Sequence, residues 1–166
     1  LKVPRFCVLL PDADPELAVE ALKSFNGSPV AVRSSAEAED GDLASFAGMY
    51  ETVLGVRTKD ELRRAIAHCR SSARSERLEA YRALHNLPES PLAIIIQELV
   101  EGEVSGVLFS HDPTMPERSL ISAAYGLGEG VVQGTVPCDT FWITAQQVIQ
   151  RQISTKDLAV RVIDGT

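Results

Sequence analysis

The stretch PVAVRSSAEAEDGDLASFAGMYET, from Pro29 to Thr52, carries the strongest structural signals of this chain. Its first five residues alternate as in a β-strand, and this strand ends on the cation Arg33. Residues 34–48 are small and acidic, a composition typical of an ordered surface loop that can move. The alternation of a strand returns from Tyr50 to Val56. We therefore predict two strands that are joined by an ordered but movable loop.

Helix signals lie on both sides of this stretch. Asp14–Pro15 supplies an N-cap and a first helical residue, and Asn26–Gly27 ends the predicted helix. Thr58 and Glu61 form a capping box ahead of a second amphipathic region. That region is interrupted by polar residues, so it predicts either one long helix or two consecutive helices before Pro88.

Apolar runs predict further strands. The first is Arg5–Leu10, ahead of the predicted helix. Leu92–Val100 and Glu103–Ser110 are predicted to pair as a hairpin, because only Glu101–Gly102 separates them. Ser119–Tyr125 is predicted as another strand.

The remaining segments complete a mixed α/β prediction. Residues 140–143 and 147–153 are predicted to form a further hairpin. The composition changes between Pro88 and Pro91, which makes this the best candidate boundary between two lobes, 1–88 and 91–166. A chain of 166 residues suits one domain or two small lobes around a cleft.

Composition excludes several classes of function. The formal net charge of −7 argues against a nucleic-acid-binding protein, which needs a basic surface to neutralise phosphates. The longest apolar run, Leu92–Ile96, is far too short to span a bilayer. Cys7, Cys69 and Cys138 are widely spaced and odd in number, which favours buried free thiols over disulfides or zinc. We therefore expect a cytoplasmic protein without nucleic-acid or membrane partners.

Arg33, Ser34 and Ser35 form the strongest candidate site. A guanidinium can bind two phosphate oxygens at once, and hydroxyl groups add donors without adding charge. The alternative is a surface ion pair between Arg33 and a carboxylate in the acidic run Glu37–Asp42. That run is itself either a metal cluster or a solvated loop face, and it lacks EF-hand spacing. The residues alone favour the ion pair.

Gln97, Glu98 and Val100 stand at the end of a predicted buried strand. Such a strand end can present backbone groups to a flat heterocycle between apolar neighbours. A core strand without any ligand is the alternative, and the residues alone favour it.

The glycine-rich segment Gly126–Gly130 resembles a phosphate-binding loop but fits neither common motif. Val131 replaces the last glycine of the dinucleotide motif, and no Gly-Lys-Ser/Thr follows. Close packing and ligand contact are therefore both open explanations for its glycines. Glu129 and Asp139 are either ligand contacts or turn caps. His111, in Ser-His-Asp-Pro, is predicted to lie in a turn rather than to be catalytic or phosphorylated.

Three blocks follow one another in the order of one known family: VAVRSSAEAEDGDLASFAGMYETVLGV, IIIQELVEGEVSGVLFSHDP and AAYGLGEGVVQGTVPCDTFWI. They resemble the ATP-binding domain shared by phosphoenolpyruvate synthase, pyruvate phosphate dikinase and rifampicin phosphotransferase. The resemblance runs over nearly the whole chain, which argues against chance.

The resemblance implies an α/β (α+β) fold of the ATP-grasp type, incomplete in this chain, with nucleotide held between two lobes. It implies Mg²⁺ and ATP as ligands, and phosphate transfer through a histidine on a separate phosphohistidine domain of the parent polypeptide to pyruvate, as in phosphoenolpyruvate synthase. One alternative is an antibiotic or secondary-metabolite phosphotransferase of the same family. Another is a non-catalytic ATP-grasp-like binding module.

Carried over position by position, the resemblance implies one group of residues at the ATP phosphates and another at the adenine. The phosphate group is Arg33, as the catalytic residue, with Ser34, Ser45, Gly48 and Met49. The adenine group is Gln97, Glu98 and Val100.

Several segments of the family have no counterpart in this chain. They are a Gly-Gly-Lys segment, an acidic metal-binding motif, a Gln-x-Arg-Pro segment and a Thr-x-x-His phosphohistidine motif. We therefore expect the metal ligands and the phosphate acceptor to lie elsewhere in a longer polypeptide. We also expect little or no phosphate transfer by this chain alone.

Overall fold

The computed structural model of the chain describes residues 2–36, 40–41, 44–45, 51–72, 74–85, 91–112, 114–145 and 147–163, with the backbone alone at 40–41, 44–45 and 77. The chain divides into two compact units, Leu1–Leu99 and Val100–Thr166. In the described residues, the first unit contains several helices and an antiparallel sheet, and the second contains one short helix and an antiparallel sheet, which confirms the mixed α/β prediction.

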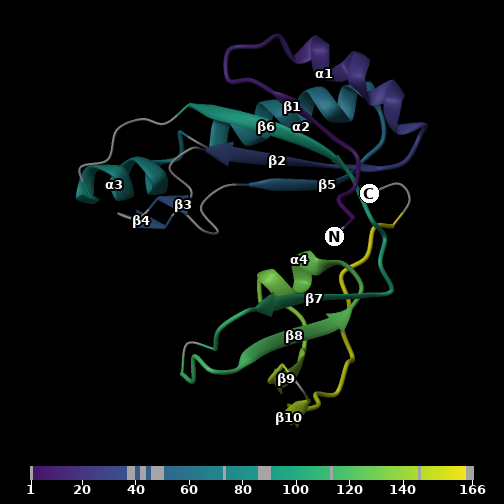
Figure 1. The fold of residues 1–166 in the computed structure, drawn as a ribbon. Helices are drawn as coiled ribbons and strands as arrows, with labels where there is room; N and C mark the ends of the chain where they lie inside the picture. Colours follow the sequence, from purple (N-terminus) through teal and green to yellow (C-terminus); the bar gives the residue numbers. More distant parts are fainter. Residues whose placement is uncertain are drawn as a thin grey trace. The chain divides into compact units, whose positions relative to one another are not determined.

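The first unit is built on a four-stranded antiparallel sheet in the order β1-β6-β2-β5 (Figure 1). Its strands are β1 (Phe6–Leu9), β6 (Leu92–Glu98), β2 (Val30–Ala36) and β5 (Thr52–Val56). A separate two-stranded ribbon pairs β3 (Asp40–Gly41) with β4 (Ala44–Ser45).

The helix signals in the sequence are confirmed. Helix α1 (Pro15–Ala21) has Asp14 as its N-cap, whose carboxylate accepts the Glu16 amide at 3.0 Å. The 3₁₀ turn η1 (Leu22–Phe25) follows, and Asn26 then adopts a left-handed conformation with φ of 54°. Left-handed backbone cannot continue a right-handed helix, so the helix ends where the sequence predicts.

The second helical region consists of two helices, α2 (Lys59–Ser72) and α3 (Glu76–His85). The capping box is present at the start of α2: the Thr58 hydroxyl accepts the Glu61 amide at 3.2 Å, and the Glu61 carboxylate accepts the Thr58 amide at 2.9 Å. The carboxylate also accepts the Arg57 amide at 2.8 Å. These backbone donors lower the pKa of Glu61.

The hydrophobic core of the first unit lies between the sheet and helices α1 and α2. Val30 and Val32 of β2 and Ile94 and Ile96 of β6 are fully buried in it. Helix α2 packs on β2, β5 and β6, and α1 packs on β1 and α2 (Figure 1). One face of the sheet is therefore covered by helices, and we call it the helix face.

The predicted hairpin between residues 92–100 and 103–110 is wrong. Strand β6 pairs with β1 and β2, whereas β7 (Val104–Phe109) pairs with β8 (Ser119–Tyr125). The two strands are adjacent in sequence but belong to different sheets. The boundary between the two compact units therefore lies between Leu99 and Val100, after β6. The boundary proposed from composition, between Pro88 and Pro91, lies before β6.

The second unit contains a four-stranded antiparallel sheet in the order β10-β9-β8-β7. The predicted strand Ser119–Tyr125 is confirmed as β8, and the predicted terminal hairpin is β9 (Asp139–Ile143) with β10 (Val148–Gln152). The short helix α4 (Gly128–Val132), which we did not predict, packs against β7 and β8 (Figure 1). In the described part of the chain, no helix is both long and apolar enough to cross a membrane.

Candidate functional site

Arg33 lies on the face of the first sheet that is opposite the helix face. Side chains alternate along β2, so Val32 and Ser34 point to the helices and Arg33 points away from them. Its cross-strand neighbours are Ile95 on β6 and Thr52 on β5. We call this surface, with Arg33, Ser35, Thr52, Ile95 and Gln97, the Arg33 face.

The Arg33 guanidinium is exposed. Among the described residues, no hydrogen bond or ion pair of this side chain is present. The predicted alternative, an ion pair with the acidic run, falls on residues 37–42, whose side chains lie outside the described part of the chain. Among the described side chains, no ion pair would have to be broken before the guanidinium binds an anion.

Gln97 joins Arg33 on the same face. Ala31 pairs with Gln97 and Arg33 with Ile95, so Arg33 and Gln97 are diagonal neighbours on adjacent strands. The Cα atoms of such diagonal neighbours are about 7–8 Å apart. Half-buried Ile95 pairs directly with Arg33 and precedes Gln97 by two residues on β6, so it lies on the same face as both. The arrangement therefore combines an anion-binding group, an apolar platform and an amide that can both donate and accept hydrogen bonds.

Ser34 is placed differently from Arg33. Its hydroxyl donates to the Glu51 carbonyl at 3.1 Å, and it points to the helix face. This hydroxyl of half-buried Ser34 is thus bonded to the backbone, on the opposite side of the sheet from the Arg33 guanidinium.

Glu98 forms a bidentate ion pair with Arg5, at 2.9 Å and 3.0 Å. Hydrogen bonding to the Arg5 guanidinium lowers the pKa of this carboxyl. The Glu98 amide donates to the Arg5 carbonyl at 2.8 Å, and the next amide, of Leu99, donates to the Pro29 carbonyl at 2.9 Å. These bonds fix the end of β6, and Val100, which is 63% exposed, follows directly.

Three predicted phosphate-site residues cannot be compared with the structure. The side chain of Ser45 and the whole of Gly48 and Met49 lie outside the described residues.

Two further residues of the Arg33 face, Thr52 and Ile95, were not singled out from the sequence. Both become neighbours of Arg33 only through strand pairing, and β6 is some 60 residues away in sequence. Ser35, named from the sequence only as a possible donor, could have been assigned to this face by its spacing of two from Arg33.

Packing explains two of the three glycines in the 126–130 segment, Gly126 and Gly130, whereas Gly128 has room for a side chain. Gly126 has φ of +85°, and a Cβ built on it would lie 2.2 Å from the Val160 carbonyl oxygen. A Cβ on Gly130 would lie 2.9 Å from a methyl group of Val160 and 3.0 Å from Val136. The Leu127 amide donates to the same Val160 carbonyl at 2.8 Å. The two glycines therefore let the segment around Val160 approach α4 closely.

Asp139 and His111 both make contacts within the protein. Asp139 accepts the Ser154 amide at 3.0 Å and pairs with Lys156, which lowers the pKa of its carboxyl.

The His111 ring lies 3.1 Å from the Ser110 hydroxyl in the turn that follows β7. The neighbouring Asp112 is buried and accepts bonds from Thr114 and Arg118, and the Thr114 bonds are the main cause that lowers its pKa to about 2.

The three cysteines are free, as predicted, but only Cys69 is fully buried, whereas Cys7 and Cys138 are half-buried.

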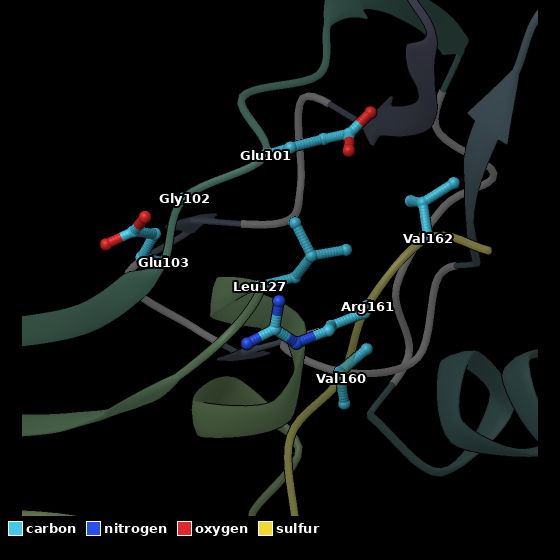
Figure 2. A pocket seen from close by; sticks show the side chains of 7 residues that line it. All are labelled: Glu101, Gly102, Glu103, Leu127, Val160, Arg161 and Val162. Carbon is cyan, nitrogen blue, oxygen red and sulfur yellow. The ribbon is translucent and has the colours of Figure 1, made fainter.

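A pocket of about 110 Å³ lies in the second unit, between residues 101–103 and 160–162, with Leu127 projecting into it (Figure 2). Pockets that hold drug-sized ligands are typically about 300 Å³ or larger, so this one is too small for a nucleotide. Figure 2 also shows the carboxylates of Glu101 and Glu103 pointing in different directions, so they do not converge on one ion.

A metal-binding cluster is not found in the described part of the chain, where no group of three or more His, Cys, Asp or Glu side chains is suitably placed.

Comparison with known proteins gives a family match over most of the chain. Residues 14–165 match the family described as pyruvate phosphate dikinase, AMP/ATP-binding domain. A solved dinucleotide-forming acetyl-coenzyme A synthetase 1 of Ca. Korarchaeum cryptofilum aligns over 87% of this chain and 55% of that one. Its TM-score is 0.49 at 17% identity, a similarity too low to argue a shared fold from.

Curated relatives agree with the family match. An uncharacterized phosphotransferase, YvkC, of Bacillus subtilis is 43% identical over 134 residues, which cover 78% of this chain and 16% of the relative. A rifampicin phosphotransferase of Bacillus cereus is 38% identical over 134 residues, or 78% of this chain and 15% of the relative. A probable phosphoenolpyruvate synthase of Methanothermobacter thermautotrophicus is 41% identical over 117 residues, or 69% of this chain and 17% of the relative.

The chain thus spans about a sixth of the length of these relatives. The blocks around Arg33, Gln97 and Gly126 all lie inside the matched residues. The chain belongs to the pyruvate phosphate dikinase AMP/ATP-binding domain family.

Proposed function

We propose that this chain is the ATP-binding part of an ATP-dependent phosphotransferase, and that the Arg33 face binds the nucleotide. The observation that carries the proposal is the placement of Arg33 and Gln97 as diagonal neighbours on one sheet face, within a chain of an AMP/ATP-binding family. Phosphoryl transfer depends mainly on positioning and on neutralising phosphate charge, and an exposed guanidinium can contribute to both.

In this proposal Arg33 contacts the ATP phosphates, because a guanidinium matches two phosphate oxygens at once. Ser45, Gly48 and Met49 belong to the segment that would cover the phosphates. Ser35 shares the Arg33 side of β2, so it is better placed than Ser34 to donate a hydroxyl to the ligand.

The adenine is proposed to lie toward the end of β6. Gln97 presents its carboxamide on the Arg33 face, and half-buried Ile95 supplies an apolar surface for a flat ring. Glu98 is proposed to contact the ring through its backbone carbonyl, because its carboxylate is paired with Arg5 and its amide donates to the Arg5 carbonyl. Val100 completes the group as the exposed apolar residue that follows.

The complete domain is proposed to have an ATP-grasp fold. Mg²⁺ would help to neutralise the phosphate charge, and its protein ligands are proposed to lie elsewhere in the protein, since the described residues offer no carboxylate cluster. The phosphate is proposed to pass to a histidine on another domain of the same polypeptide. The protein is proposed to be cytoplasmic, without nucleic-acid or membrane partners.

The final acceptor separates two versions of the proposal. Pyruvate is the acceptor in the first, supported by the probable phosphoenolpyruvate synthase at 41% identity. An antibiotic or secondary metabolite is the acceptor in the second, supported by the rifampicin phosphotransferase at 38% identity. Both versions share the same ATP-binding step.

A labelling experiment tests the proposed activity. The full-length protein is incubated with Mg²⁺ and ATP labelled at the β or γ phosphate, and the protein is analysed for acid-labile, base-stable phosphate. We expect labelling of a histidine outside this chain in the wild type, and a loss of at least tenfold in the labelling rate in Arg33→Ala. Nucleotide binding without any labelling would instead support the non-catalytic binding module.

A further inference from the structure

The carbonyl of Glu51 is the centre of a small hydrogen-bond network on the helix face, next to Arg33 in the sequence of β2. It accepts the Ser34 hydroxyl at 3.1 Å and the Ser34 amide at 3.5 Å. The Cys69 thiol lies 3.5 Å from the same oxygen and 3.6 Å from the Val32 carbonyl. Cys69 belongs to α2 and is completely buried. We call Ser34, Glu51 and Cys69 the Glu51 node.

The Glu51 node holds β2 on both sides of Arg33. The thiol reaches the carbonyl of Val32, the residue before it, and the Glu51 carbonyl binds Ser34, the residue after it. All of these contacts lie on the helix face, so they leave the guanidinium free on the opposite side. The backbone of Arg33 is thereby fixed by groups that cannot themselves touch a ligand bound to its side chain.

The same node fixes the start of β5. Glu51 directly precedes Thr52, which pairs with Arg33 across the two strands. Between Val30 and Val32 the pairing of β2 with β5 is irregular, where Gly55 adopts φ of +75°. Regular pairing is therefore short at this edge of the sheet, and the node adds side-chain bonds at the point where Thr52 and Arg33 meet.

We infer that Ser34 is a positioning residue for Arg33, acting with Cys69 through the Glu51 carbonyl, and that its hydroxyl does not contact ATP. The inference rests on the proposed phosphate contact of Arg33. A hydroxyl that already donates its one proton to a carbonyl has no donor left for a phosphate oxygen. Removal of this bond loosens the placement of the guanidinium, and small displacements of a binding group weaken its charge-assisted bonds.

A double-mutant cycle in the full-length protein tests the inference. ATP affinity is measured by calorimetry for the wild type, Ser34→Ala, Arg33→Ala and the double variant. We expect Ser34→Ala to weaken binding about 3- to 10-fold, the range of one hydrogen bond. We expect this loss to disappear in the Arg33→Ala background, because a positioning residue has nothing left to position.

Two variants serve as controls. Ser34→Thr keeps the hydroxyl and should retain wild-type affinity. Ser71→Ala removes a hydroxyl that donates to the His68 carbonyl at 2.8 Å on α2, away from the node, and should leave ATP affinity unchanged.

The outcomes separate the inference from the proposed function. Equal losses from Ser34→Ala with and without Arg33 would overturn the inference, since they indicate a direct contact of Ser34 with ATP. Unchanged affinity in Ser34→Ala would overturn it as well. Unchanged affinity in Arg33→Ala would instead remove the proposed phosphate contact itself.

Discussion

Gly126→Ala offers a sharp test of how the second unit is held together. The residue has φ of +85°, a left-handed conformation in which a side chain costs about 1–2 kcal/mol. The added Cβ would also lie 2.2 Å from the Val160 carbonyl oxygen, a distance that forces the backbone to move. That movement breaks the 2.8 Å bond from the Leu127 amide and disturbs the packing of Val160 on Gly130. Overpacking of this kind costs about 1–3 kcal/mol, so we expect a total loss of about 2–5 kcal/mol.

Gly134→Ala is the matched control. This glycine has φ of +66° in the same unit, but nothing lies within 4 Å of the position of its Cβ. It should therefore carry the conformational cost alone, about 1–2 kcal/mol. Gly128→Ala, whose Cβ would meet only Ser105 at 3.8 Å, should cost less than either.

The assay is urea unfolding followed by the fluorescence of Trp142. It is the chain's single tryptophan and lies in β9 of the second unit. The packing explanation of Gly126 would be refuted if Gly126→Ala and Gly134→Ala had the same free energy of unfolding, within about 0.5 kcal/mol.

Two further predictions concern local structure. Thr58→Ala removes the hydroxyl of the capping box and should destabilise the first unit by about 0.5–2 kcal/mol in urea unfolding. Thr58→Ser keeps a hydroxyl and should keep the wild-type stability. Equal stability of all three proteins would contradict a capping role. Asp112 has its pKa lowered to about 2, so its carboxylate stabilises the fold above the unfolded pKa of about 3.9, and the stabilisation disappears as pH falls toward 2. The difference in melting temperature between the wild type and Asp112→Asn should therefore shrink between pH 5 and pH 2, and a constant difference would argue against this assignment.

Features that depend on neighbouring residues could be predicted from the sequence. The N-cap at Asp14, the capping box at Thr58 and the helix end at Asn26 each act within one turn of backbone, and all three are present. The strand at 119–125 is likewise marked by its own residues. Local chemistry is sufficient for these elements.

Features that depend on distant residues could not be predicted in the same way. A short connection suggested that residues 92–100 pair with 103–110, but β6 instead completes the first sheet beside β1 and β2. The need for glycine at Gly126 comes from Val160, which is far away in sequence. Both contacts are made only after the sheets assemble.

The candidate site shows the same division. Arg33 and Gln97 were identified from the sequence, the first by its charge at a strand end and both through the resemblance to a family. That they share one face, and that Ser34 points to the other, follows from the pairing of β2 with β6 and from the bond to Glu51. The inference that Ser34 positions Arg33, rather than contacting the ligand, rests on this bond, which the sequence does not show.

The most direct test of the central claim is a calorimetric titration of Mg²⁺ and ATP into the full-length protein, its Arg33→Ala variant and the control Arg64→Ala. Arg64 is also exposed, but it lies on α2. We predict that Arg33→Ala loses about 1.5–3 kcal/mol of ATP binding free energy, as expected for a charge-assisted contact, and that Arg64→Ala matches the wild type. Equal ATP affinity in all three proteins would contradict the claim that the Arg33 face binds the phosphates.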